Sequence, residues 1–348
     1  MIALRIILAL TAVAIFGVAI ARFERLEISR LTLIITTIIA AGVVVVAIAP
    51  GLFNPIFEAF KLNPGTGKRL IGLLLFAVVV LFALLIRTMA GTDSAVRSIR
   101  LLVEALAVQA FEQGHRTALP EGPRIVVVLP AFNEAGNVGA IVHAIPEEVE
   151  GLPVVAIVVD DGSDDGTWEV AERAGALVAR LPIRRGGGLA LRVGYEIALK
   201  LGAMIVVTMD ADGQHVPDEI PLLVKPIMED QADLVNGSRV LGEFERESRI
   251  RGVGVRFFSS LVTVMTGSRV TDVSNGFRAT RAEVLAKFVL DQDQFWTSEL
   301  LIEAMRHRVR VKEVPITIRA RAGGVSKKPK NLQYGWRFAK AIMKTWLR

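Results

Sequence analysis

The sequence contains no cysteine, and that absence removes several kinds of chemistry at once. A disulfide framework, a thiolate nucleophile and any zinc or iron–sulfur site with cysteine ligands are excluded. Only four histidines are present, and none is paired with another at short helical spacing: His115, His143, His215 and His307. A histidine-rich zinc site is therefore not expected. Any bound metal should be a hard cation held by carboxylate or amide oxygens.

Charged residues are also scarce, at 22% of the 348 residues, and aromatic residues make up only 6%. Hydrophobic residues reach 52%, which is too high for an ordinary soluble enzyme. These values predict that an apolar part and a charged part occupy different regions of the chain, and the length favours two domains. The net charge of +6 favours anionic partners, either lipid headgroups or phosphorylated substrates.

Three long stretches near the N-terminus carry no charge, and each is long enough to cross a bilayer. They predict a transmembrane domain over residues 1–90, with spans at about 3–21, 31–51 and 70–87. Arginines follow the first and third spans, so we expect the N-terminus outside the plasma (inner) membrane and the rest of the chain in the cytoplasm. A second interpretation is a signal peptide cut after Ala19-Ile20-Ala21. It would leave two spans and place the C-terminal domain outside.

Two further segments are predicted to lie at the membrane surface. Residues 91–118 have apolar positions at helical spacing and predict a juxtamembrane amphipathic helix or linker, which lies along the interface or packs on the soluble domain. Residues 331–348 mix aromatic and aliphatic side chains with Lys and Arg, and they predict a basic amphipathic interfacial helix. A basic segment of this kind could also bind nucleic acid, but nothing else in the sequence favours that partner.

Between residues 119 and 330, short β-branched runs alternate with amphipathic helices. The predicted strands are Ile125–Leu129, Val154–Val159 and Met204–Met209, and the predicted helices lie near 137–145, 167–174, 189–201 and 218–229. This alternation predicts an α/β domain with a mostly parallel sheet that is covered on both faces. Ligands of such sheets bind beyond the carboxyl ends of the strands.

Acidic and small residues follow the first two predicted strands. The first strand ends in Pro130-Ala131-Phe132-Asn133-Glu134, and the second ends in Asp160-Asp161-Gly162-Ser163-Asp164-Asp165-Gly166-Thr167. Carboxylates at these ends can accept hydrogen bonds from a nucleobase or a ribose, and the glycines allow tight turns against a ligand. For Asp164 and Asp165, capping of the next helix is an equally good interpretation.

The third strand ends in Asp210-Ala211-Asp212-Gly213-Gln214-His215. Two carboxylates in an Asp-x-Asp turn, with the amide oxygen of Gln214, can bind Mg²⁺ or Mn²⁺ and leave positions for phosphate oxygens. A lone Asp-x-Asp is a weak signal, but this one is the third in a series of acidic strand ends. His215 is interpreted as a residue that packs the loop.

A basic glycine-rich loop, Arg184-Arg185-Gly186-Gly187-Gly188, lies between these motifs and precedes a helix. Backbone N–H donors at a helix N-terminus suit a diphosphate. The loop is not a G-x-G-x-x-G directly after the first strand, so a dehydrogenase is a poor fit.

From about Arg124 to Lys328 the chain resembles a family 2 glycosyltransferase of GT-A fold, of the polyprenyl-phosphate or dolichol-phosphate mannose synthase-like branch. Besides the motifs above, the resemblance rests on Gly237-Ser238-Arg239, the segment 271–278, Glu313-Val314-Pro315-Ile316 and the segment 319–327. The N-terminal third resembles, by hydropathy, a small three-span membrane family that is found beside such transferases.

This resemblance implies roles for particular residues. It assigns the nucleotide to Pro130, Asn133, Glu134, Asp160, Asp161, Arg184 and Asp210, and the metal to Asp210, Asp212 and Gln214. It assigns the acceptor lipid phosphate to Arg239, Arg251 and Lys327, and it counts these three residues and Asp212 as catalytic. Two positions depart from the family pattern. Gly187 stands where a lysine is common, and Val255 stands where a serine is common.

The implied reaction transfers a sugar from a UDP- or GDP-sugar to a polyprenyl phosphate at the cytoplasmic face of the membrane, in the synthesis of cell-envelope glycans. A phosphate monoester has a second pKa near ~6, so the acceptor oxygen is already anionic and needs no strong base. Direct displacement would invert the anomeric centre. Neither the sugar nor the base follows from the sequence, and three spans leave a homo-oligomer as an open hypothesis.

Two other functions compete with this one. A processive polysaccharide synthase would carry Gln-x-x-Arg-Trp, whereas this chain has Gln292-Asp293-Gln294-Phe295-Trp296, without the arginine. A non-catalytic sugar-nucleotide sensor or scaffold is disfavoured by the intact Asp-x-Asp. Glu299 and Glu313 are interpreted as structural or as partners of arginines.

Overall fold

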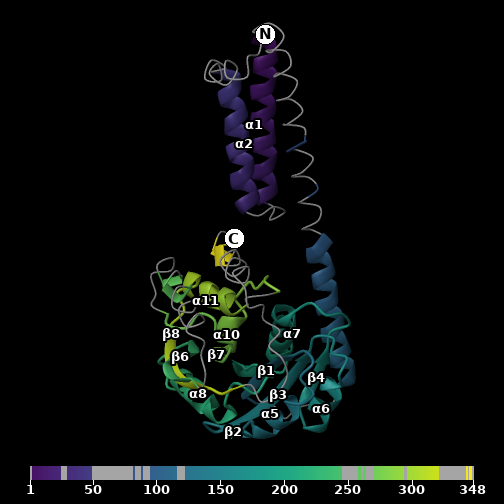
Figure 1. Ribbon diagram of the computed structural model, residues 1–348, viewed down its shortest axis with the longest axis vertical. Coiled ribbons are helices and arrows are strands. Elements are labelled where there is room, and N and C mark those ends of the chain that lie inside the picture. The colour runs from purple at the N-terminus through teal and green to yellow at the C-terminus, as the bar shows by residue number, and fades with distance from the viewer. Residues whose placement is uncertain are drawn as a thin grey trace. The chain divides into compact units, whose positions relative to one another are not determined.

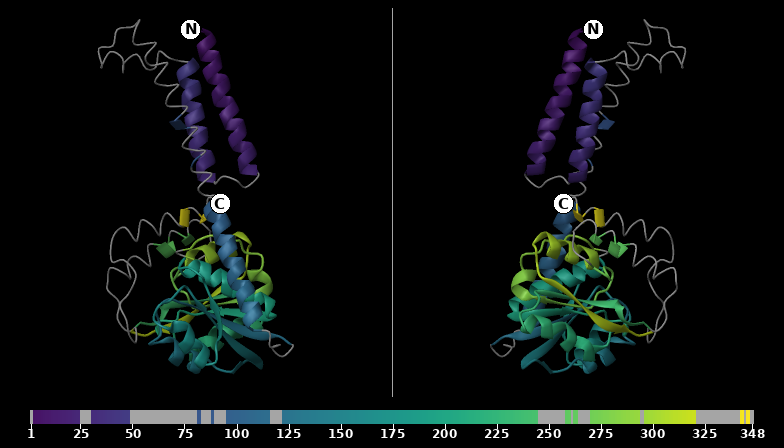
Figure 2. Two further views of the ribbon diagram at one scale, coloured as in Figure 1. Left: turned by 90° about the vertical axis from the view of Figure 1, so that its right-hand side faces the viewer. Right: turned by 90° about the vertical axis from the view of Figure 1, so that its left-hand side faces the viewer.

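The computed structural model describes residues 2–24, 30–48, 81–82, 88, 95–115, 122–244, 258–260, 262–263, 270–293, 296–320, 342–343 and 345–346. The chain divides into two compact units: Met1–Ile99 with Leu347–Arg348, and Arg100–Trp346. Figures 1 and 2 show helices in the first unit and a sheet flanked by helices in the second.

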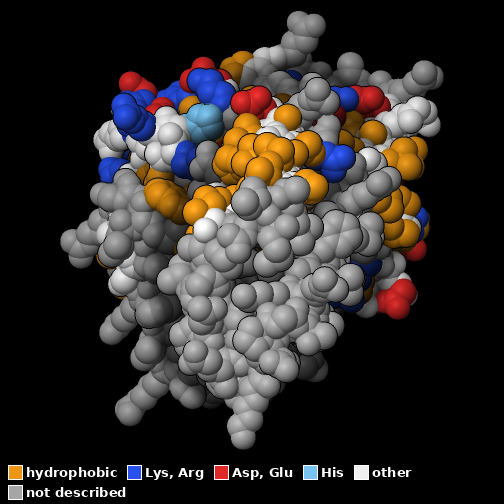
Figure 3. Space-filling view, turned by 90° about the horizontal axis from the view of Figure 1, so that it is seen from above, with side chains coloured by type: hydrophobic (Ala, Val, Ile, Leu, Met, Phe, Trp, Pro, Cys, Tyr) orange, Lys and Arg blue, Asp and Glu red, His pale blue; other side chains and the backbone are white. Residues whose placement is uncertain are grey.

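The N-terminal unit contains two helices that pack side by side, α1 (Ile2–Glu24) and α2 (Arg30–Ile48). Their sequences are almost wholly apolar, and many large side chains remain exposed. Leu10 of α1 is 63% exposed and Ile38 of α2 is 66% exposed. Figure 3 shows hydrophobic side chains gathered in patches on the face that is seen from above. Apolar surface of this extent marks a site of contact with lipid or protein.

The structure does not support the predicted transmembrane domain. Within the residues that it describes, no helix offers a stretch that is both long and apolar enough to cross a membrane. α1 has Arg5 and Arg22 within its bounds, and α2 ends at Ile48. The predicted span at 70–87 lies outside the described residues except at 81–82, and the predicted helix at 331–348 lies outside them except at 342–343 and 345–346.

An eight-stranded sheet forms the centre of the second unit. Its strands are β1 (Arg124–Ala131), β2 (Glu148–Val149), β3 (Leu152–Asp160), β4 (Leu177–Arg180), β5 (Ala203–Thr208), β6 (Leu234–Phe244), β7 (Arg278–Arg281) and β8 (Val311–Ile318). Their order is β2-β3-β1-β5-β7-β6-β8, and β4 pairs with β3.

The sheet is mixed but mostly parallel, as predicted, because six of its eight strands run in one direction while β2 and β7 run in the other. β1 runs parallel to β3 and β5, β3 to β4, and β6 to β8. β7 lies antiparallel between β5 and β6, and β2 lies antiparallel to β3. The predicted strands at 125–129, 154–159 and 204–209 are confirmed by β1, β3 and β5. β7 was not predicted because its sequence, Arg-Ala-Thr-Arg, lacks an apolar run.

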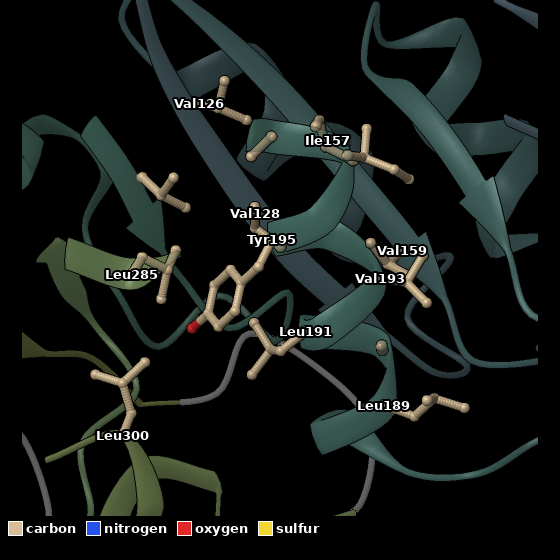
Figure 4. Packing of buried hydrophobic residues seen from close by; sticks show 14 of the residues in the cluster. Val126, Val128, Ile157, Val159, Leu189, Leu191, Val193, Tyr195, Leu285 and Leu300 are labelled. Atoms are coloured by element: carbon tan, nitrogen blue, oxygen red, sulfur yellow. The ribbon is translucent and has the colours of Figure 1, made fainter. Parts of the chain in front are cut away.

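Both faces of the sheet are buried, as the sequence predicts. The side chains of β1 alternate between two cores: Val126 and Val128 belong to one, and Ile125, Val127 and Leu129 to the other. Figure 4 shows the first core, in which Val128 and Val159 pack against Val193 and neighbouring side chains. The period of two along a strand places successive side chains on opposite faces.

Different helices cover the two faces of the sheet (Figure 1). The first core takes in a helix over residues 95–114, α7 (Gly187–Lys200), α10 (Ala282–Leu285) and α11 (Trp296–Arg306). The second takes in α5 (Val138–Ala144), α6 (Thr167–Arg173) and α8 (Ile220–Met228), which follows the short 3₁₀ turn η2 (Pro217–Glu219). The helices predicted near 137–145, 167–174, 189–201 and 218–229 are thus confirmed.

The helix over residues 95–114 packs on the sheet domain through one face. Val103, Ala107 and Phe111 are buried in the first core, while Leu102 and Leu106 on another face are 59% and 47% exposed. Residues four apart lie on the same side of a helix, which explains this division. Between residues 103 and 111 the structure therefore favours the linker helix packed on the domain over a helix that lies only along a membrane surface.

Replacing Gly194 of α7 by alanine should destabilise the fold. A Cβ at this position would lie 2.3 Å from Cγ1 of Val128, a rigid side chain in a buried strand. Overpacking typically costs ~1–3 kcal/mol, and the gain in helix propensity returns only ~1 kcal/mol. We expect thermal unfolding to show a net loss of up to about 2 kcal/mol. Gly136→Ala, where a Cβ meets nothing within 4 Å, is the control. Equal melting temperatures for both variants would contradict this packing.

Candidate active site

Three strand ends meet at one edge of the sheet. Ala131 at the end of β1 lies in register with Asp160 at the end of β3, and Val128 lies in register with Thr208 at the end of β5. The N–H of Asp161 donates to the carbonyl oxygen of Ala131 at 2.8 Å, so the pairing of β1 and β3 continues past β3. The acidic residues after β3 and β5 therefore lie on either side of the loop that follows β1.

The loop after β1 is fastened to the loop after β3. Pro130 still belongs to β1, whereas Asn133 adopts a left-handed conformation with φ of 54°. The N–H of Asn133 donates to Oγ of Ser163 at 2.9 Å, and its Oδ1 accepts from the N–H of Asp164 at 3.1 Å. Asn133, assigned to the nucleotide by resemblance, thus joins two loops.

Glu134 and Asp165 hold the first turns of the two neighbouring helices. The N–H of Glu134 donates to Oγ1 of Thr167 at 2.8 Å, and Oε2 of Glu134 accepts from Nδ2 of Asn137 at 2.8 Å. Asp165 accepts hydrogen bonds from the N–H groups of Thr167 and Ala135, both at 3.1 Å. Asp165 thus binds the first residue of α6 and the loop after β1, although the N-cap position of α6 is Gly166.

Asp160 and Asp161 are buried, and burial raises the pKa of both carboxyl groups above its ordinary value. The carboxylate of Asp160 accepts from the N–H of Ser163 at 3.3 Å. Asp161 uses both oxygens: Oδ1 accepts from the N–H of Arg185 and Oδ2 from the N–H of Gly186, each at 2.7 Å. Asp161 therefore holds the glycine-rich loop, a role that the strand-end motif did not reveal.

The glycine-rich loop reaches the end of β1 and leads into α7. The guanidinium group of Arg184 lies over the ring of Phe132, with Cζ 3.8 Å from its centroid. Gly186 has φ of 105°, which favours glycine. A Cβ on Gly187 would lie 3.5 Å from Nε1 of Trp296, an ordinary contact, so packing does not require glycine there.

The Asp-x-Asp turn follows β5 directly. The N–H of Gln214 donates to Oδ1 of Asp212 at 3.2 Å, and Nε2 of Gln214 donates to the carbonyl oxygen of Arg319 at 3.4 Å. Among the described residues, no group of three or more acidic and histidine side chains could hold a metal. The oxygen donors of Asp210, Asp212 and Gln214 fit Mg²⁺ or Mn²⁺ that takes its remaining ligands from phosphate and water.

The side chain of His215 holds the Asp-x-Asp turn in place. Its Nδ1 accepts from the N–H of Asp210 at 3.0 Å, and its Nε2 lies 3.1 Å from Oδ1 of Asn275. Nδ2 of Asn275 donates to the carbonyl oxygen of Gly237 at 2.6 Å, so Oδ1 is the acceptor and His215 carries its proton on Nε2. The ring stacks on Phe277, with centroids 5.0 Å apart. His215 packs the loop, as the sequence analysis proposed.

Arg239 is held by a fully buried carboxylate. Its Nε donates to Oδ2 of Asp272 at 2.6 Å, its Nη2 donates to Oδ1 of Asp272 at 3.0 Å, and Nη2 also donates to Ser274 at 2.6 Å. The N–H groups of Thr271 and Asp272 donate to Glu313, at 2.8 and 3.3 Å. Nδ2 of Asn236 also donates to Glu313 at 2.8 Å, so Glu313 is structural and accepts from two backbone N–H groups and an amide. Arg251 and Lys327 lie outside the described residues.

Two buried side chains, Arg278 and Tyr195, had no role predicted from the sequence. Arg278 donates to Oδ1 of Asn236 at 2.7 Å and to the carbonyl oxygens of Val273 and Thr297. Its burial lowers its pKa to about 10. Burial also raises the pKa of Tyr195 to about 12. Arg278 lies in the segment 271–278, on which the resemblance partly rests. A charged residue in that segment was the signal from which a role for Arg278 could have been predicted.

Comparison with known proteins decides the family. A sequence model of glycosyl transferase family 2 matches residues 126–289. Polyprenol monophosphomannose synthase from Mycolicibacterium smegmatis is 33% identical over 220 residues, which cover 59% of this chain and 80% of that protein. The chain belongs to glycosyltransferase family 2.

Two further proteins show how widely this similarity extends. UDP-N-acetylglucosamine–dolichyl-phosphate N-acetylglucosaminyltransferase from Methanococcus voltae is 30% identical, over 55% of this chain and 84% of the relative. The crystal structure of glucosyl-3-phosphoglycerate synthase from Mycobacterium tuberculosis, with Mn²⁺, UDP and glucosyl-3-phosphoglycerate, has a TM-score of 0.52 and 25% identity. It covers 69% of this chain and 81% of that one. The GT-A-like fold of this glycosyltransferase is thereby confirmed.

Replacing Asp161 by asparagine should weaken nucleotide binding to this glycosyltransferase. An amide group retains one acceptor for the two N–H groups that the carboxylate now binds. Hydrogen bonds to a charged group contribute ~1.5–3 kcal/mol, so we expect the Kd for UDP or GDP to rise about tenfold or more. Titration calorimetry on the full chain measures this. Asp164→Asn, an exposed carboxylate in the same loop, is the control. An unchanged Kd in Asp161→Asn would contradict the role of this side chain.

Proposed function

We propose that this family 2 glycosyltransferase transfers a sugar from a nucleoside diphosphate sugar to a polyprenyl phosphate. One observation carries the donor half: the acidic loops after β3 and β5 lie on either side of the loop after β1, and Asp161 fastens the glycine-rich loop beside them. The two relatives support the acceptor half, because their names share an isoprenoid lipid phosphate and differ in the sugar.

The nucleotide would bind where these loops meet. The N–H groups of the glycine-rich loop and the N-terminus of α7 are suited to the diphosphate, and Arg184 supplies positive charge where the family commonly has a lysine in place of Gly187. Asp210, Asp212 and Gln214 would hold Mg²⁺ or Mn²⁺, and that ion would neutralise charge on the departing nucleoside diphosphate. The metal-bound state of the solved neighbour supports this assignment.

The acceptor phosphate requires positioning more than activation. At neutral pH a phosphate monoester is largely dianionic, so its oxygen can attack without a strong general base. Arg239 is fixed by two hydrogen bonds to Asp272 and would present its guanidinium group to the phosphate. Arg251 and Lys327 are proposed to assist it. Direct attack on the anomeric carbon would invert its configuration and give a β-linked product from an α-linked donor.

We further propose that the N-terminal unit attaches the enzyme to the plasma membrane, with the glycosyltransferase domain on the cytoplasmic face. The exposed apolar side chains of α1 and α2 support this placement. A lipid-phosphate acceptor stays in the headgroup layer, so an enzyme held there meets it without extracting the lipid. We keep the predicted division of the chain into segments 1–90, 91–118, 119–330 and 331–348, and we place 331–348 at the membrane surface.

Product should form only when the lipid acceptor is present, and its formation should depend on Asp212. Purified full-length protein is incubated with Mg²⁺ or Mn²⁺, a short polyprenyl phosphate and a panel of UDP- and GDP-sugars, and products are followed by mass spectrometry. We expect a glycosylated lipid phosphate with one donor. Asp212→Asn should lower kcat/KM about a hundredfold or more, because the metal loses a charged ligand. Asp218→Asn, an exposed carboxylate nearby, should not.

The same assay separates the competing functions. With phosphoglycerate added as a second acceptor, transfer to phosphoglycerate alone would contradict the lipid proposal. Polymeric products would favour a processive synthase. Nucleotide binding without turnover on any acceptor would favour the sensor. Retained configuration at the anomeric carbon would overturn direct displacement.

The full-length protein should remain in the membrane pellet after extraction with alkaline carbonate, which strips proteins held by charge alone. The reason is the apolar surface of α1 and α2, since burial of apolar area contributes ~25 cal/mol per Å². Cell fractionation and immunoblotting measure this. Release by carbonate or by high salt would show that only surface electrostatics hold the protein.

A further inference from the structure

The glycine-rich loop, Arg184–Gly188, is held on two sides. Asp161 binds it on one side. On the other, the N–H of Gly188 donates to the carbonyl oxygen of Asp293 at 3.0 Å. A Cβ on Gly186 would lie 2.9 Å from that oxygen, and a Cβ on Gly188 would lie 2.0 Å from the carbonyl oxygen of Gln292. The loop and the segment 291–293 therefore touch through their backbones.

A buried carboxylate fixes that segment in turn. Glu299 of α11 is fully buried and accepts from the N–H of Asp291 at 2.7 Å and from the N–H of Gln292 at 2.9 Å. Bonds from a carboxylate to backbone N–H groups are charge-assisted and strong. Glu299 is thus structural, as the sequence analysis proposed, and it gives Asp293 a defined position.

The carboxylate of Asp293 gathers three arginines from three segments. Arg192 of α7 lies 3.0 Å away, Arg100 of the helix over 95–114 lies 3.2 Å away, and Arg185 of the glycine-rich loop lies 3.6 Å away. Arg100 also pairs with Asp291. The side chain of Arg192 is only 8% exposed, so solvent screens its ion pair weakly.

Two of the residues that make these contacts lie outside the part of the chain that matches the family model. The match covers residues 126–289, whereas Arg100 precedes it and Asp293 follows it. A helix before the matched region and a segment after it therefore meet at the glycine-rich loop, which is proposed to receive the donor diphosphate.

We propose that Asp293 and Arg100 are positioning residues for the donor. Asp293 holds Arg185 and the backbone of the glycine-rich loop in the geometry that receives the diphosphate, and Arg100 holds Asp293. Neither residue touches the acceptor. This inference rests on the nucleotide-sugar donor of the proposed function, and it adds that donor affinity depends on the helix that joins the N-terminal unit to the glycosyltransferase domain.

The test compares three variants of the full chain: Asp293→Asn, Arg100→Gln and Glu112→Gln. Glu112 lies on the same helix as Arg100 and pairs with Lys200 of α7 at 2.7 Å, but the two side chains are 53% and 46% exposed. We expect Asp293→Asn and Arg100→Gln each to raise the donor KM and the Kd for the nucleotide about tenfold. The acceptor KM should stay unchanged, and Glu112→Gln should resemble the wild type.

Combining Asp293→Asn with Arg100→Gln should add little to either single change, because both break the same contact. Unchanged nucleotide affinity in folded Arg100→Gln and Asp293→Asn would overturn the proposal, and so would equal losses in donor and acceptor KM. The Kd is measured without any acceptor. If wild-type protein binds nucleotide but glycosylates no lipid phosphate, the proposed function fails while the Kd values still decide this inference.

Discussion

The hydrogen-bond register of β1 between β3 and β5 determines where every acidic loop of the site lies. Because the three strands are parallel, their carboxyl ends reach the same edge, and Ala131 is level with Asp160. One residue of slip would turn each buried side chain of β1 to the other face of the sheet. Since both faces are packed with apolar side chains, the two cores and the site are specified by the same pairing.

Carboxylates hold several of the loops at that edge by accepting hydrogen bonds from them. Asp161, Glu299 and Glu313 each accept two or more hydrogen bonds, mainly from backbone N–H groups of segments that have no regular structure. A buried carboxylate is stable only when such donors satisfy it. These groups therefore give the loops a defined shape before a nucleotide binds, and preorganisation of this kind reduces the entropy that binding costs.

Much of the fold could be predicted from the sequence because apolar runs and turn residues are local signals. β1, β3 and β5 and the helices between them follow from such runs, whereas β7 does not, since its four residues are mostly polar. The packing role of His215 was predicted correctly. Glu299 and Glu313 were predicted to be structural or partners of arginines, but they mainly accept from backbone N–H groups, which no side-chain pattern can indicate.

The sequence by itself determined which chemical groups are present and their order: acidic strand ends, a glycine-rich loop and an Asp-x-Asp turn, in a chain without cysteine. Only the tertiary structure decided which of those carboxylates hold loops. The physical reason is that the deciding hydrogen bonds join residues far apart in the chain. Asp161 meets Gly186, and Gly188 meets Asp293, only after the sheet has formed and α7 has packed on it.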